Sequence, residues 1–157
     1  MIPSKNNGYL SGHISIVTES YFQLTGRQIS FNGTQGETAA GLAEAIFQAP
    51  FALVSHGIEK EPVFNYANKT AMQLFNMNWD EMTALQSKYS AEMPGREQRS
   101  QLLQGVKENG YIENYSGVRI AKGGQRLYIE QATVWNLTDA TGAYYGQAAM
   151  FSHWRFL

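Results

Sequence analysis

The last third of the chain constrains the fold most strongly, because it reads as three long strands joined by two short turns. The stretches 111–120, 126–137 and 143–154 are rich in Tyr, Val, Ile and Trp, which are residue types enriched in strands. A Gly-Gly pair at 123–124 and an Asp-Ala-Thr-Gly sequence at 139–142 separate them, and both sequences favour tight reversals. We therefore expect an antiparallel meander at this end.

The middle of the chain predicts two short strands and then helices. Residues 51–55 and 62–66 read as strands, and Asn68 and Asn78 each stand where they can cap a short helix. Pro94 and Gly95 precede a longer helix that ends near Gly110. Two strands, several helices and three strands indicate an α+β fold with short helices on one face of an antiparallel sheet. PAS domains have this order of elements, and an NTF2-like cone is the alternative.

The N-terminal section predicts helices. Apolar residues recur at spacings of three and four from Leu10 to Leu24, which is one stripe on a helix that Gly26 stops. Thr34 and Glu37 have the spacing of a capping box before a second helix. We therefore divide the chain into a helical extension at 1–49, with residues 1–8 disordered, and a PAS-like core at 50–157.

One face of the predicted sheet is apolar at both ends and polar in the middle. A two-residue turn at Gly123-Gly124 pairs Ile112 with Trp135 and Ile120 with Leu127. Unpartnered buried polar groups are costly, so the polar middle indicates either a ligand or hydrogen bonds across the strands. Aromatic residues of the second strand and the short helices either stack on a planar ligand or fill the core. The candidate pocket residues are Asn114, Ser116, Gln131, Thr133, Trp135, Tyr66, Phe75 and Trp79.

The other face of the predicted sheet carries several tyrosines and needs a cover. The apolar helix at 10–24 is suited to cover it, either within one chain or across a dimer, and we expect a homodimer. The candidate dimer or partner surface consists of Ile14, Val17, Tyr21, Leu24, Tyr115 and Tyr128.

Several segments resemble the MEKHLA domain, a family regarded as PAS-like. The most specific are PVFNYANKTAMQLF at 62–75, YSGVRI at 115–120 and VWNL at 134–137, and the resemblance extends from about Leu24 through Trp154. The family occurs as small stand-alone bacterial proteins, the type expected here, and at the C-terminus of plant homeodomain–leucine zipper transcription factors. The resemblance implies a PAS-like fold and a sensory or regulatory role, and it brings no catalytic residues.

Composition limits the cofactors. PAS domains commonly hold flavin, haem or metabolites, but the chain has no cysteine, which excludes a cysteinyl–flavin adduct and thiolate-ligated metals. Aligning the start of the last long strand with flavin-binding domains points Ala148, rather than Gln147, inward, which disfavours flavin. His13, His56 and His153 are scattered and read as surface or capping residues, so neither haem nor a metal site is expected, and the cofactor stays unknown.

Charge and hydropathy limit the partners. The net charge is −1 and no basic stripe is present, which argues against nucleic acid. The first residues lack the apolar stretch of a signal peptide and no apolar run reaches membrane length, so we expect a cytoplasmic protein.

Three functions remain. The leading interpretation is a non-catalytic sensory domain that binds a small molecule in a partly polar pocket. The alternative is a protein-interaction or dimerisation module with a self-filled core and a regulatory protein partner. An NTF2-like enzyme ranks last, because Glu113 and Glu130 fall on the outer face and no nucleophile–base pair is evident.

Overall fold

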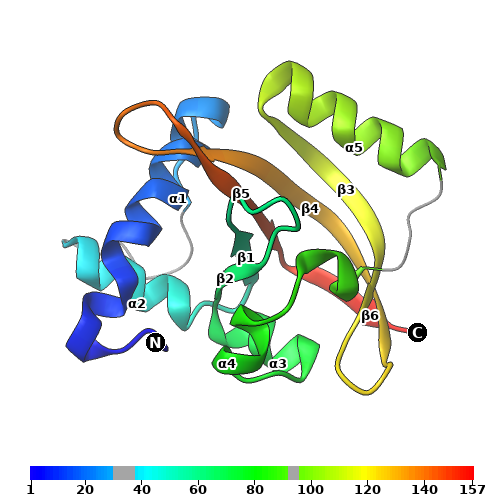
Figure 1. Cartoon of the computed structure of the whole chain (residues 1–157), viewed down its shortest axis with the longest axis horizontal. Helices are drawn as coiled ribbons and strands as arrows, with labels where there is room; N and C mark the ends of the chain where they lie inside the picture. Colours follow the sequence, from blue (N-terminus) through cyan, green and yellow to red (C-terminus); the bar gives the residue numbers. More distant parts are fainter. Residues whose placement is uncertain (30–37, 92–95) are drawn as a thin grey trace.

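The computed structural model describes residues 1–29, 38–91 and 96–157. Its centre is an antiparallel sheet of six strands in the order β2-β1-β5-β4-β3, with β6 paired to the first half of β4 (Figure 1). The strands are β1 (Ala52–His56), β2 (Phe64–Ala67), β3 (Tyr111–Ile120), β4 (Arg126–Thr138), β5 (Tyr144–Phe151) and β6 (His153–Phe156). The predicted α+β class and antiparallel meander are confirmed.

The β3–β4 hairpin is one residue out of the predicted register. Ala121 and Gln125 close the turn through an amide-to-carbonyl bond of 2.8 Å, so three residues rather than two form the loop. Ile120 therefore pairs with Arg126, and Ile112 with Val134. The loop consists of Lys122, Gly123 and Gly124, and both glycines have positive φ.

Two β-bulges change which side chains face which side of the sheet. Asn114 has φ 58° and Gln131 has φ 56°, and the β3–β4 register shifts beside each of them. An extra residue in a strand reverses the alternation of side chains beyond it. Consequently Ile129 and Val134 both face the same side although their numbers differ in parity.

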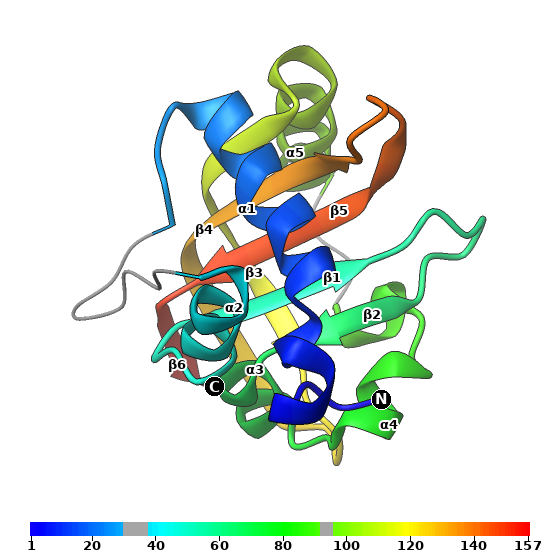
Figure 2. The same ribbon diagram turned by 90° about the vertical axis from the view of Figure 1, so that its left-hand side faces the viewer.

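The N-terminal helices cover one face of the sheet within the chain. Helix α1 (Ser11–Thr25) and helix α2 (Ala39–Phe47) lie in front of the strands in Figure 2. The indole nitrogen of Trp135 on β4 donates to the carbonyl of Val17 at 3.1 Å, and Val17 has no exposed surface. The cover is thus intramolecular, but it lies on the other face from the one predicted. Helix α1 covers the face of Trp135, which the sequence predicts for the pocket, whereas Tyr115 lies on the cavity side.

The start of the chain also packs on this layer. Lys5–Leu10 form a 3-10 helix, η1, and the ring of Tyr9 lies 6.2 Å from that of Phe47. The prediction of disorder through residue 8 is therefore not what the structure shows. Gly26 ends α1 at φ 73°, as predicted.

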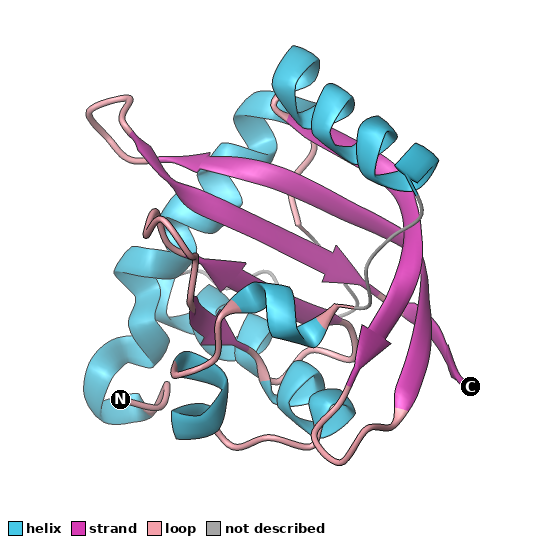
Figure 3. Cartoon of the chain, turned by 45° about the vertical axis from the view of Figure 1, so that its right-hand side comes forward, coloured by secondary structure: helices cyan, strands magenta, loops and turns pink. Residues whose placement is uncertain are grey.

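Short helices cover the opposite face. These are α3 (Lys69–Phe75), α4 (Trp79–Thr83), the 3-10 helix η2 (Ser87–Ser90) and the longer α5 (Arg96–Asn109). Helix α5 runs beside β3, and β3 and β4 curve around the helical side (Figure 3). The caps predicted at Asn68 and Asn78 are confirmed, the latter with a full capping box to Glu81. Thr38 caps helix α2. The residues predicted to begin helices α2 and α5, Thr34, Glu37, Pro94 and Gly95, lie outside the described residues.

Asn68 is a buried junction between three elements. Its side-chain oxygen accepts from the amides of Leu53 and Ala71, and its side-chain nitrogen donates to the carbonyls of Ile46 and Phe51, all at 2.8–3.1 Å. A fully satisfied amide in the core fixes geometry without the penalty of an unpaired polar group. It thereby holds α3 against β1 and the end of α2.

Among the described residues, no helix combines the length and the apolar character needed to cross a bilayer.

Candidate functional site

A cavity of about 210 Å³ lies between the sheet and the short helices. Its walls come from β1, β3, β4 and β5 on one side and from α3, η2 and α5 on the other. Most of the lining is apolar, and it includes Val54, Phe64, Phe75, Leu102, Ile129, Ala132, Val134, Ala149 and Phe151. The volume is below the range of roughly 300–1,000 Å³ of most drug-sized sites, so the cavity suits a small ligand.

The charged side chains that line the cavity are both cations. Lys88 on η2 lies 3.0 Å from Glu61 and both side chains are about half exposed. Arg119 on β3 is half-buried, with its guanidinium carbon 5.8 Å from the centre of the Tyr115 ring. No carboxylate stands among the described lining residues, so the charge on this side of the cavity is positive.

Three polar groups add hydrogen-bonding capacity. The Tyr115 side chain lies over Gly117, where an added Cβ would stand 3.1 Å from the tyrosine hydroxyl. Gln147 on β5 lines the cavity, and its amide nitrogen donates to the side-chain oxygen of Asn136 at 3.3 Å. Ser90 already donates to the carbonyl of Ser87. The side-chain oxygen of Gln147 and the hydroxyl of Tyr115 are therefore two polar groups that a ligand can contact.

The polar residues predicted for the pocket do not meet in this cavity. Asn114 and Gln131 are the two bulge residues and are exposed, and Ser116 lines none of this cavity. Gln131 and Thr133 instead border a separate hollow of about 190 Å³ beside Tyr21 on the α1 side. The physical reason is the pair of bulges, because the predicted alternation holds up to each bulge and is reversed after it.

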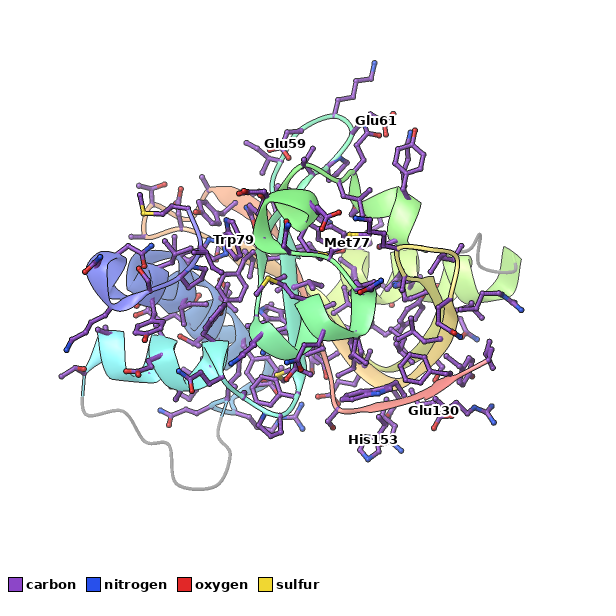
Figure 4. All side chains as sticks on the ribbon, turned by 90° about the horizontal axis from the view of Figure 1, so that it is seen from below. Glu59, Glu61, Met77, Trp79, Glu130 and His153 are labelled. Atoms are coloured by element: carbon purple, nitrogen blue, oxygen red, sulfur yellow. The ribbon has the colours of Figure 1, made fainter. Side chains whose placement is uncertain are left out.

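The predicted aromatic residues are divided between the two faces. Phe75 lines the cavity as predicted, but Trp135 and Tyr66 are fully buried on the α1 side. Trp79 packs edge-on against Tyr66 at 5.8 Å, and Figure 4 shows it at the edge of the short helices. These three side chains form core rather than pocket wall.

The residues predicted to form a dimer surface do not lie on one surface of the structure. Ile14, Val17 and Tyr21 are buried inside the chain, and Leu24 packs beside them. Tyr115 is buried in the cavity wall, not on the outer face. Tyr128 is half-buried and lies under Arg155, 5.0 Å from its guanidinium carbon. A homodimer remains a prediction, and most of the surface named for it is already occupied.

Sequence reasoning missed Arg119 and Gln147. A two-residue turn at Gly123-Gly124 places Arg119 on the outer face of the sheet, and the alignment of the last long strand points Ala148 rather than Gln147 inward. Gly146 has φ 148°, and the β4–β5 register shifts between Leu137 and Thr138, which turns Gln147 toward the cavity. Gly146 is evident in the sequence, but the sequence does not predict that its backbone conformation changes the side to which Gln147 points.

His13 is also not the surface residue that its position suggested. Its Nδ1 lies 3.2 Å from the Tyr145 hydroxyl, its Nε2 lies 2.9 Å from Ser55 Oγ, and its ring stacks on Tyr66. Burial lowers the pKa of His13 from 6.5 to about 4, so the imidazole is neutral near pH 7. The network joins α1 to β1 and β5.

The His13–Ser55 contact is not a nucleophile–base pair. Ser55 donates to the side-chain oxygen of Asn65 at 2.6 Å, so its oxygen is left to accept from His13 Nε2–H. Tyr145 then donates to Nδ1, and every donor in the chain has an acceptor. A base would need an unprotonated nitrogen facing the serine, and this arrangement presents the opposite tautomer.

The strand carboxylates lie outside the cavity. Glu113 pairs with Arg27, and Glu130 lies 3.5 Å from Arg155. Figure 4 places Glu130 beside His153, on the side of the molecule opposite Glu59 and Glu61 of the β1–β2 loop. The described residues contain no cluster of three His, Asp or Glu side chains suited to a metal ion.

Comparison with known families matches the MEKHLA domain model to residues 11–156. The match begins at α1, so it includes both N-terminal helices as well as the core predicted at 50–157. A curated relative, the homeobox-leucine zipper protein ATHB-14 of Arabidopsis thaliana, is 24% identical over 145 residues. That alignment covers 90% of this chain and 17% of the relative.

Solved structures share the fold at low sequence identity. A PAS domain from Colwellia psychrerythraea has a TM-score of 0.57 at 15% identity and covers 73% of this chain and 92% of that one. An RNA-binding light-oxygen-voltage receptor has a TM-score of 0.62 at 15% identity, covering 80% and 36%. The light-state dimer of the fungal photoreceptor Vivid has 0.57 at 12%, covering 90% and 91%. The predicted PAS-like fold is confirmed.

Proposed function

The chain belongs to the MEKHLA domain family, and on that premise we propose that it is a sensory domain that binds a small molecule between its sheet and its short helices without catalysing a reaction. One observation carries the proposal. The cavity has an apolar wall interrupted by a few convergent polar groups, Tyr115, Arg119 and Gln147, which is the usual character of small-molecule sites.

The absence of a reactive arrangement supports a non-catalytic role. Ser55 and His13 form a satisfied hydrogen-bond chain, and the strand carboxylates Glu113 and Glu130 are paired with arginines on the outside. The hydroxyl of Ser90, which lines the cavity, donates to the carbonyl of Ser87 rather than to a base. Binding, rather than bond breaking, is what these groups are arranged to do.

Strand β1 connects the cavity to the N-terminal helices and offers a route for signalling. Val54 and His56 line the cavity from β1, while Ser55 between them bonds to His13 of α1. A ligand that shifts β1 would therefore alter a contact with the N-terminal helices. We propose that α1 and α2 pass the bound state on, to a second copy or to a regulatory protein.

The experiment is native mass spectrometry of the purified full chain, followed by a thermal-shift screen of small metabolites. Ala132 is fully buried and lines the cavity, so Ala132→Leu fills the space. Ala40→Leu adds the same atoms at an exposed position of α2 and is the matched control. We expect a compound that raises the melting temperature of the wild type and of Ala40→Leu but not of Ala132→Leu.

A second function is favoured by the size of the cavity. A cavity of about 210 Å³ is below the usual range for ligand sites, as expected of an interaction module whose core is nearly filled by its own side chains. If the domain is an interaction module, native mass spectrometry should find only the mass of the bare chain. No compound should raise the melting temperature of the wild type and fail to raise that of Ala132→Leu. This second function also predicts that Ala132→Leu leaves partner capture unchanged, so the same variants separate the two functions.

A further inference from the structure

We propose that the ligand of this cavity is a small organic anion, an apolar body carrying one carboxylate that binds Arg119. The inference rests on the proposed function, since it names the chemical class for the same site. It begins from an imbalance of charge, because the described lining contains two cations and no carboxylate.

The two cations are not equivalent. Lys88 is exposed and its Nζ lies 3.0 Å from a carboxylate oxygen of Glu61, so its charge is already neutralised by an ion pair. Arg119 forms no ion pair among the described residues and is half-buried. A half-buried guanidinium with no ion pair among the described residues keeps donors that a bound anion can use.

The surroundings of Arg119 hold it in place. Its backbone forms a bridge to Ala91 and pairs with Leu127, and its guanidinium carbon lies 5.8 Å from the Tyr115 ring centre. The planar donor fork of arginine matches the two oxygens of a carboxylate. The backbone of Arg119 is thus paired on both sides, and its side chain lies against Tyr115 at the wall of the cavity.

The rest of the cavity specifies the remainder of the ligand. The wall formed by Phe64, Phe75, Ile129, Val134 and Phe151 is apolar, and it suits a hydrocarbon chain or ring. The Tyr115 hydroxyl lies on the same face as Arg119, and Gln147 offers a side-chain oxygen. These groups allow a second, uncharged polar substituent. The small volume limits the body to a short chain or a single ring.

The test compares acids with their neutral amides on the full chain. Benzoate, phenylacetate and hexanoate are titrated by calorimetry beside benzamide, phenylacetamide and hexanamide. We expect at least one acid to bind about 10-fold or more tightly than its amide, because hydrogen bonds to a charged group are stronger than those to a neutral one. Equal binding of acid and amide in all three pairs, or no binding by any acid, overturns the inference.

Variants of Arg119 test whether this residue causes the preference for the acid over the amide. Arg119→Gln should remove the difference between acid and amide, whereas Arg119→Lys should retain part of it, because lysine keeps the charge and loses the fork. Arg155→Gln is the matched control, because Arg155 is exposed, lies 3.5 Å from Glu130 and is not among the lining residues. It should change the affinity for the acid by less than about 3-fold, as expected of an exposed paired charge. Circular dichroism confirms that each variant is folded. A preference that survives Arg119→Gln overturns the assignment.

The outcomes also separate this inference from the proposed function. Suppose that native mass spectrometry finds an uncharged molecule and that Ala132→Leu abolishes its binding. The inference of an anionic ligand is then wrong, whereas the proposal that this cavity binds a ligand is supported. If no compound of either class binds and no bound mass is found, both fail.

Discussion

His13 Nε2 lies 2.9 Å from Ser55 Oγ, so an N-terminal helix and the strand that walls the cavity share one hydrogen bond. The bond requires a neutral imidazole with its proton on Nε2, because Ser55 donates onward to Asn65. Protonating the second nitrogen turns the acceptor that faces Tyr145 into a donor. The contact between the two layers is therefore sensitive to acid.

Acid should weaken the fold through His13. Its pKa is about 4 in the folded chain and 6.5 ordinarily, so between these values the unfolded chain binds the additional proton. Stability from this group is full above pH 6.5 and is lost as the pH falls toward 4. Urea titrations at pH 7 and pH 5 should show a loss of about 2 kcal/mol in the free energy of unfolding.

The loss of stability in acid should be specific to His13. His13→Gln should have a nearly flat free energy of unfolding over the same range, while His153→Gln, which changes an exposed residue, should keep the wild-type slope. A slope that persists in His13→Gln would place the titrating group elsewhere.

Asn68→Asp should destabilise the chain by at least about 3 kcal/mol, because the new carboxylate cannot donate to the carbonyls of Ile46 and Phe51 and is buried beside them. Asn78→Asp is the matched change at an exposed helix cap, where aspartate caps as well as asparagine. It should alter the free energy of unfolding by less than about 0.5 kcal/mol. Denaturant melts of both variants check this, and similar losses in the two would contradict the buried role of Asn68.

Gly146→Ala should disrupt the edge of β5 next to β1. Gly146 has φ 148°, and an added Cβ would collide with the carbonyl oxygen of His56. Gly12→Ala adds the same methyl group to α1, where nothing lies within 4 Å, and should stabilise the helix by about 0.5–1 kcal/mol. Thermal melts should shift in opposite directions, and a tolerated Gly146→Ala would mean that β1 and β5 are farther apart.

Val17→Asp should prevent folding at every protein concentration, because it buries an unpaired charge inside the chain. Phe22 is 49% exposed on the same helix, and Phe22→Asp should stay folded as the control. Circular dichroism and size-exclusion chromatography distinguish the cases. A folded monomer of Val17→Asp would show that this stripe is a contact between copies, not the core of one.

The sequence was sufficient for the fold but not for the site, and β4 shows why. Its length, its turns and its apolar content are local properties, and each was predicted. The side to which Trp135 points depends on Gln131 adopting a left-handed backbone, which is set by pairing across the sheet rather than by glutamine itself. Helix caps such as Asn68 and Asn78 were predictable because their hydrogen bonds are made within three residues.

The residues that the prediction missed have the same cause. Arg119 and Gln147 look like ordinary exposed strand residues, and their position depends on a three-residue loop and on the backbone of Gly146. His13 lies 42 residues from Ser55 and 132 from Tyr145 in the sequence, so no local pattern could connect them.

The left-handed residue at Gln131 has a consequence for transferring knowledge between relatives. Before Gln131 the odd-numbered side chains of β4 face the cavity, and after it the even-numbered ones do. An alignment with a relative whose strand is regular needs a gap there, even where the lengths are equal. Without that gap, ligand contacts copied onto the second half of β4 fall one position away from the side chains that face the cavity.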